Sequence, residues 1–195
     1  MTVDLSGSLH SHTFHTDYRN PNERSKSPFD LGYFVRRCME YGRNFQAVTD
    51  IRAQRPGFPA FDEQRYVELI KTADPNDNSY ELEASKTEAR VYIPSTREVF
   101  YILRTQEVLT NVPKKHVLAV NVGDMPGGES PEETLKRIKG GGGFAIIDHP
   151  FMCGAWNEDE IHRAYEVGLI GAIEWNGGLT FPACLDLIPG LKYKT

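Results

Sequence analysis

Three of the six histidines of this chain lie within one short stretch, GSLHSHTFHTD, residues 7–17. If residues 4–12 form a strand, the alternation of side chains places His10 and His12 on the same side. Two imidazoles on one side can share a metal ion, because neutral imidazole nitrogen is a good ligand for zinc, manganese and iron. Asp17 could add a carboxylate ligand. The stretch predicts a metal site; a polar turn with chance histidines is the other interpretation.

Further residues of this kind stand at the ends of short apolar runs. His149 ends the run in IIDHPF, His116 begins HVLAVNV, and Glu174 follows an apolar run in AIEWNGG. A buried histidine needs a partner, so each histidine is either a ligand or a hydrogen-bonded core residue. Asp50, like His149 and Glu174, stands at the C-terminal end of its run. Active sites of parallel α/β proteins gather at that edge.

Helix signals alternate with these apolar runs. Residues 27–42, 130–140 and 157–168 each combine a capping residue, an apolar stripe or capping box, and a closing glycine. Residues 45–50, 116–122, 144–150 and 169–175 read as short buried strands. Such alternation predicts an α/β fold with a largely parallel sheet, whose doubly buried strands are continuously apolar.

Length and composition narrow the class of protein. The 195 residues fit a single domain over 1–195, and the formal net charge of −5 argues against binding to a nucleic-acid backbone. Nucleic acid is expected only as a nucleotide substrate. No apolar run is long enough to span a membrane, and the N-terminus lacks a secretory signal. The three scattered cysteines, Cys38, Cys153 and Cys184, read as reduced thiols of a cytoplasmic protein.

Several blocks of this sequence resemble the polymerase and histidinol phosphatase (PHP) superfamily. The blocks are LHSHTFHTD, FQAVTD, IPSTREV, HVLAV, GGFAIIDHP and GAIEWNGG, in that order, from Leu9 to Asn176. The resemblance implies a distorted (β/α)7 TIM-like barrel, complete or lacking its last elements. It also implies two or more divalent ions of zinc, manganese or iron, and hydrolysis of a small phosphorylated metabolite or nucleotide.

The resemblance also implies roles for individual residues. The metal ligands it implies are His10, His12, Asp17, Glu98, His116 and His149. Glu98 would bridge two ions and serve catalysis, and Asp50 would orient a ligand or shuttle a proton. Arg52 and Arg55, just after Asp50, would contact the substrate phosphate.

Two departures from the family pattern leave three interpretations open. Ile51 stands where the family usually has a histidine ligand, and no histidine follows His162, so the family's late Asp-x-His pair is absent from this sequence. The first interpretation is a metal-dependent phosphoesterase. The second is a catalytically impaired metal-binding or regulatory module. The third is a metal hydrolase of the amidohydrolase type, against which no lysine is well placed as a bridging carbamate.

Overall fold

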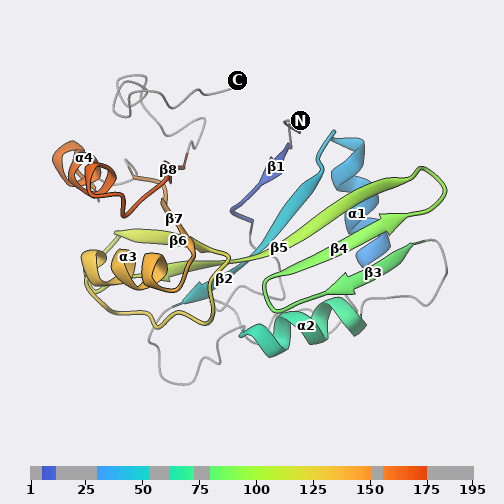
Figure 1. Cartoon of the computed structure of the whole chain (residues 1–195), viewed down its shortest axis with the longest axis horizontal. Helices are drawn as coiled ribbons and strands as arrows, with labels where there is room; N and C mark the ends of the chain where they lie inside the picture. Colours follow the sequence, from blue (N-terminus) through green and yellow to red (C-terminus); the bar gives the residue numbers. More distant parts are fainter. Residues whose placement is uncertain (1–5, 12–29, 53–61, 73–79, 151–155, 175–195) are drawn as a thin grey trace. The chain divides into compact units, whose positions relative to one another are not determined.

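The computed structural model describes residues 6–11, 30–52, 62–72, 80–150 and 156–174 of the chain (Figure 1). By its contacts the chain divides into two units, residues 1–51 with 55–105, and residues 52–54 with 106–195. Strand β5 (Glu98–Leu109) passes from the first unit to the second after Thr105. The single domain over 1–195 stays a prediction.

The described residues of the first unit form two helices and an antiparallel meander. Its elements are β1 (Gly7–Ser8), α1 (Leu31–Glu40), β2 (Phe45–Arg52), α2 (Glu63–Thr72), β3 (Glu81–Ala84), β4 (Glu88–Ile93) and the first part of β5. β1 pairs in parallel with β2, which neighbours β5, whereas β3, β4 and β5 pair antiparallel (Figure 1). The core of this unit includes Leu31, Val35, Val48, Tyr66, Ile70, Phe100 and Ile102.

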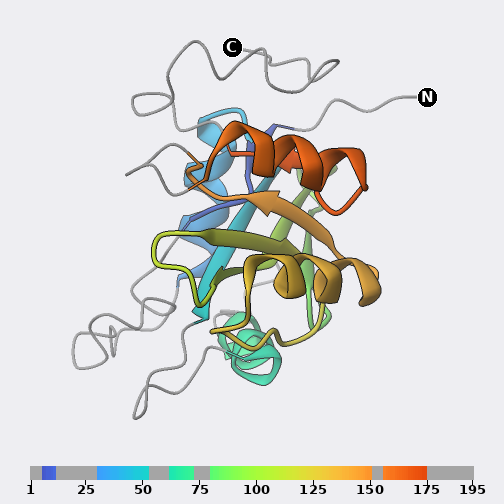
Figure 2. The ribbon, with the colours of Figure 1, turned by 90° about the vertical axis from the view of Figure 1, so that its left-hand side faces the viewer.

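The described residues of the second unit form the end of β5 and five further elements. These are β6 (His116–Val120), α3 (Pro131–Gly140), β7 (Phe144–Ile147), α4 (Glu158–Glu166) and β8 (Ala172–Ile173). β6 pairs antiparallel with β7, and β7 pairs in parallel with β8. Helix α3 packs against β6 and β7 (Figure 2). The core of this unit includes Val117, Ala119, Leu135, Ile138, Ile147, Trp156, Ile161 and Ile173.

The prediction of a (β/α)7 barrel with a parallel sheet is wrong. The connection between β6 and β7 shows why. The N–H of Gly128 donates to the carbonyl of Leu109, and the N–H of Asn111 donates to that of Glu129, both at 2.8 Å. Residues 121–130 therefore return to the edge where β6 begins, before α3 starts. Helix α3 then runs back, so β7 starts beside the end of β6 and runs antiparallel to it.

The helix ends follow the predicted capping signals in two of three cases. Ser130 with Glu133 begins α3, and Asn157 with Glu160 begins α4, each as a complete capping box. At α1 the N-cap is Asp30, whose carboxylate accepts the N–H of Tyr33 at 2.7 Å. The predicted cap, Ser27, lies outside the described residues and is not the N-cap of α1.

The first strand is shorter than the sequence predicts. β1 covers only Gly7–Ser8, so His10 follows the strand and the alternation argument for His10 and His12 does not apply. Across the described helices, none has the length and hydropathy required to cross a membrane.

Candidate metal site

Strand pairing brings together, in the second unit, four side chains of the types that can bind a metal ion. They are Glu107, His116, Asp148 and His149. His116 begins β6, and Asp148 follows the end of β7. Because Val117 pairs with Ile147 in the antiparallel register, the start of β6 lies beside the end of β7. The N–H of Asp148 also donates to the carbonyl of His116 at 3.3 Å.

The donor atoms of these side chains face one another. Oε1 of Glu107 lies 2.6 Å from Nδ1 of His116 and 3.5 Å from Nε2 of His149. The two ring nitrogens are 3.2 Å apart, and Oδ2 of Asp148 lies 3.0 Å from Nε2 of His149. Donors bound to one tetrahedral ion at about 2.0–2.1 Å are about 3.3 Å from one another. The spacing of the cluster therefore fits one shared ion.

Glu174 holds the backbone next to this cluster. Ile147 pairs with Ile173 in the parallel register of β7 and β8, and the N–H of Glu174 donates to the carbonyl of Ile147 at 2.8 Å. Oε2 of Glu174 accepts the N–H of His149, also at 2.8 Å. His149 has a φ of 26°, a positive value that residues other than glycine rarely adopt. Strain of this kind persists where the surroundings impose it and is frequent at functional sites.

The side chains of the cluster are buried, so their charges interact strongly. Asp148 is fully buried, Glu107 is 6% exposed and His149 is 9% exposed. Burial by itself lowers the pKa of His149, but hydrogen bonds and charges of Asp148 and Glu107 outweigh it and raise this pKa to about 10. The carboxylates therefore stabilise positive charge at the position where the donor atoms converge, as a cation site requires.

The chemistry of the donors fits a borderline transition metal. Two imidazole nitrogens with carboxylate oxygens suit zinc, manganese and iron, whereas calcium and magnesium prefer oxygen alone. Groups of histidine and acidic side chains thus lie within metal-binding distance in this protein. Glu107, His116, Asp148 and His149 are the residues that could hold the ion.

The structure brings together two of the predicted ligands. His116 and His149 meet in the cluster. His10 is half-buried in the first unit, where the Ser8 hydroxyl donates to its carbonyl at 3.0 Å. Four predicted residues cannot be placed: His12, Asp17 and Arg55 lie outside the described residues, and the side chain of Arg52 does as well. Their roles stay predictions.

The two predicted catalytic carboxylates, Asp50 and Glu98, are not neighbours in the first unit. Asp50 is 1% exposed on β2, and its Oδ2 lies 3.9 Å from Nη2 of the buried Arg104. Glu98 is exposed at the start of β5 and lines a pocket of about 190 Å³. Arg104 lies about 20 Å further along the same strand. The catalytic roles of both carboxylates stay predictions.

Sequence reasoning missed two of the four cluster residues. Asp148 directly precedes His149 at the end of an apolar run, which was a usable signal. Glu107 stands near the end of β5, the long strand 98–109, and charged residues are seldom fully buried unless they are paired. That rule would have marked Glu107 as a residue in need of a partner, although not which partner.

Comparison with models of known protein families and with curated proteins found no match. The resemblance to the PHP superfamily therefore stays a prediction carried by the residue blocks alone. The functional argument rests on the geometry of Glu107, His116, Asp148 and His149.

Proposed function

We propose that this protein is a metal-dependent hydrolase of phosphoesters. Glu107, His116, Asp148 and His149 bind a divalent ion of zinc, manganese or iron, and the substrate is a small phosphorylated metabolite or nucleotide. One observation carries the proposal: four donor atoms, from β5, from β6 and from the residues just after β7, lie within 4.8 Å of one another, and three of their residues are buried. Groups that need charge compensation seldom converge in this way without a function.

The ion and the side chains of the cluster would have distinct roles. A divalent ion supplies a Lewis acid, which lowers the pKa of water and offsets the negative charge of phosphoryl oxygens. The imidazoles of His116 and His149 bind as neutral ligands. Oε1 of Glu107, 2.6 Å from Nδ1 of His116, would bind the same ion as this nitrogen.

His116 is the side chain of the cluster that a substrate could reach most easily. The side chain of His116 is 23% exposed, whereas those of Glu107, Asp148 and His149 are at most 10% exposed. A phosphate that approaches on the His116 side would reach the ion and leave the buried carboxylates behind it. The number of ions follows from metal analysis: two or more are predicted, and these four donors suffice for one.

The test is an assay of the full chain on an aryl phosphate after removal of metal and reloading with zinc, manganese or iron. We expect hydrolysis only in the reloaded protein, and a loss of about 100-fold or more in His116→Ala and His149→Ala, since even supporting residues cost 10–100-fold. His162→Ala is the matched control, because His162 lies on α4 outside the cluster.

Two outcomes would contradict the proposal. One is a reloaded protein with no phosphoesterase activity. The other is activity that the two cluster variants retain. Turnover of amides or lactones in place of phosphoesters would favour the amidohydrolase interpretation, and metal binding without turnover would favour a regulatory module.

A further inference from the structure

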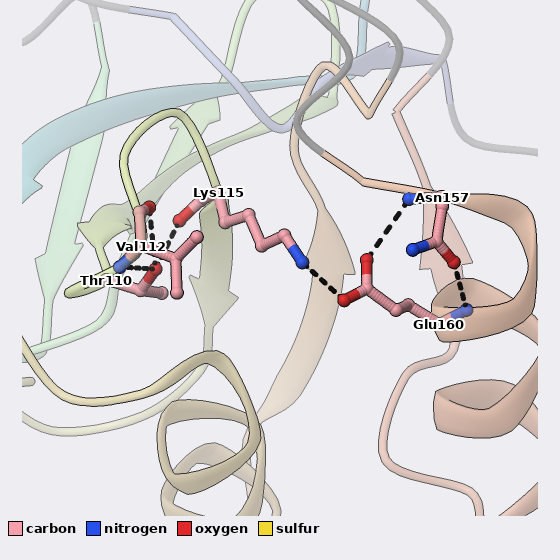
Figure 3. A network of polar contacts seen from close by, with 5 residues as sticks. All are labelled: Thr110, Val112, Lys115, Asn157 and Glu160. Atoms are coloured by element: carbon pink, nitrogen blue, oxygen red, sulfur yellow. Dashed lines mark hydrogen bonds and ion pairs between the residues drawn. The ribbon is translucent and has the colours of Figure 1, made fainter.

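The residues next to the two histidine ligands are both tied to the start of α4. Lys115 precedes His116, and its Nζ donates to Oε1 of Glu160 at 2.5 Å (Figure 3). The same Nζ lies 5.2 Å from the centre of the Trp156 ring. Pro150 follows His149, and its carbonyl accepts the N–H of Trp156 at 3.2 Å. One short segment, 156–160, therefore contacts the chain beside both histidines.

Glu160 uses its two carboxylate oxygens for different purposes. Oε2 accepts the N–H of Asn157 at 3.2 Å, while Oδ1 of Asn157 accepts the N–H of Glu160 at 2.9 Å (Figure 3). These two bonds form the capping box of α4. Oε1 remains for Lys115. The same side chain thus fixes the first turn of α4 and the position of Lys115.

The backbone of Lys115 is held as well as its side chain. The hydroxyl of Thr110 donates to the carbonyl of Lys115 at 2.8 Å (Figure 3). The N–H of Lys115 donates to the carbonyl of Val112 at 3.1 Å. The N–H of Val112 in turn approaches the Thr110 hydroxyl at 3.3 Å. The connection between β5 and β6, which carry Glu107 and His116, is therefore anchored at both ends.

The Lys115–Glu160 ion pair is better shielded from water than the ion pair between Lys136 and Glu132 in the same unit. The side chains of Lys115 and Glu160 are 13% and 29% exposed. Those of Lys136 and Glu132, an i,i+4 pair on α3, are 61% and 71% exposed. Exposed pairs of this kind contribute little, because solvent screens them and the side chains stay mobile. The shielded pair is the one that can hold a fixed geometry.

We propose that the Lys115–Glu160 ion pair is a positioning element that sets the separation of His116 and His149 for metal binding. This inference rests on the proposed function, since it assumes that the two histidines are ligands. A metal site tolerates errors of only about 0.5 Å in its ligands. Residues that support ligands commonly change metal affinity by 10–100-fold.

The test compares zinc affinity, by competition with a chelator, and the cobalt(II) absorption spectrum in the wild type and five variants of the full chain, one of which is His149→Ala. Glu160→Gln keeps the capping box, because glutamine serves at that position, but removes the charge that holds Lys115. Lys115→Met removes the other partner. We expect both variants to bind zinc at least about tenfold more weakly, with an altered cobalt spectrum. Lys115→Arg should restore most of the affinity, and the control Lys136→Met should match the wild type.

The outcomes separate this inference from the proposed function. Wild-type protein that binds neither zinc nor cobalt overturns both. Glu160→Gln and Lys115→Met proteins that bind zinc as tightly as the wild type, while His149→Ala does not, overturn the positioning role and leave the metal site standing. Equal weakening in Lys115→Met and Lys136→Met also overturns it. If Lys115→Met does not fold, the zinc affinity of Glu160→Gln alone tests the positioning role.

Discussion

Nδ1 of His116 lies 3.2 Å from Nε2 of His149, with the two rings 74° apart and their centres separated by 4.8 Å. The two residues are 33 positions apart in the chain and meet because β6 and β7 run antiparallel. Glu107 places a carboxylate oxygen against both nitrogens. Two ring nitrogens and an oxygen that face one point are the arrangement of ligands around a shared cation.

Zinc should stabilise the folded protein against heat through this cluster. At a free concentration about 100 times its Kd, a ligand that binds only the folded state adds about 2.7 kcal/mol. We expect a higher melting temperature in zinc than in a chelator, and no such difference in His149→Ala. Differential scanning calorimetry of both proteins gives the measurement. His162→Ala should respond to zinc like the wild type, and a response retained by His149→Ala would speak against the cluster.

The ion pair of Glu160 should make stability depend on pH in the acid range. Burial raises the pKa of this carboxyl, but hydrogen bonds from Lys115 and from the backbone of Asn157 outweigh burial and hold the pKa below the ordinary 4.5. The folded state therefore favours the charged form. The resulting stability is present above pH 4.5 and is lost as the pH falls through the lowered pKa.

Replacement of Glu160 by glutamine should remove this acid dependence. We expect Glu160→Gln to be less stable than the wild type near neutral pH, by up to about 1 kcal/mol. The difference should shrink as the pH falls through the lowered pKa of Glu160, because the wild-type carboxyl then becomes protonated too. Urea denaturation at neutral and at acid pH checks this, and a difference that stays constant or grows in acid would be inconsistent with the lowered pKa.

Tyr66→Phe should destabilise the first unit. The Tyr66 hydroxyl is fully buried and donates to the carbonyl of Ile102 at 2.7 Å. Its removal leaves a buried acceptor short of a donor, which costs about 1–3 kcal/mol. Urea denaturation should show this loss, while Tyr33→Phe, at a residue that is 58% exposed, should change stability little. Equal effects of the two substitutions would show that the hydrogen bond from Tyr66 to Ile102 does not stabilise the first unit.

The same tyrosine should limit stability in alkali. Burial, with a smaller contribution from Glu88, raises the pKa of Tyr66 above its ordinary 10.0. Its contribution to stability is full below pH 10 and is lost as the pH rises through the raised value. The wild type should therefore lose more stability than Tyr66→Phe when the pH is taken above 10. Parallel losses in both proteins would show that other groups control alkaline unfolding.

Asp50→Asn should strongly destabilise the first unit, because it removes the buried carboxylate charge beside Arg104. The loss of one partner from a buried pair costs about 3–5 kcal/mol. The double variant Asp50→Leu/Arg104→Met should recover most of this loss, since an apolar pair of similar volume often replaces a buried ion pair at little cost. Denaturation curves of the single and double variants give the free energies of unfolding that test this prediction. If Asp50→Asn is as stable as the wild type, the structural role of Asp50 is refuted, and its predicted catalytic role is the one left to test.

Local signals in the sequence predicted the elements well. Ser130 with Glu133 and Asn157 with Glu160 marked the helix starts, because a capping box depends on residues only three apart. The apolar run from His116 also became a strand. Strand direction was not predictable in this way. A continuous apolar run has the same appearance in parallel and antiparallel pairs, and the return of residues 121–130 to Leu109 depends on tertiary hydrogen bonds.

The candidate site also combines residues that the local sequence identifies with contacts that depend on the tertiary fold. His116 and His149 stood out by residue type at the ends of apolar runs. Glu107 did not, because its approach to His116 requires the turn between β5 and β6, and no spacing rule encodes that contact. His10 stood out by spacing, but β1 ends before it.

The most direct test of the metal site is elemental analysis of the full chain after dialysis against zinc and then against metal-free buffer. The account predicts at least one zinc ion retained per wild-type chain. It predicts loss of that ion in Glu107→Gln, which keeps the shape of the side chain and removes its charge. It also predicts retention in Glu132→Gln, which alters an exposed acid on α3. Wild-type protein without stoichiometric zinc, or Glu107→Gln protein that retains it as firmly as the wild type, would contradict the account.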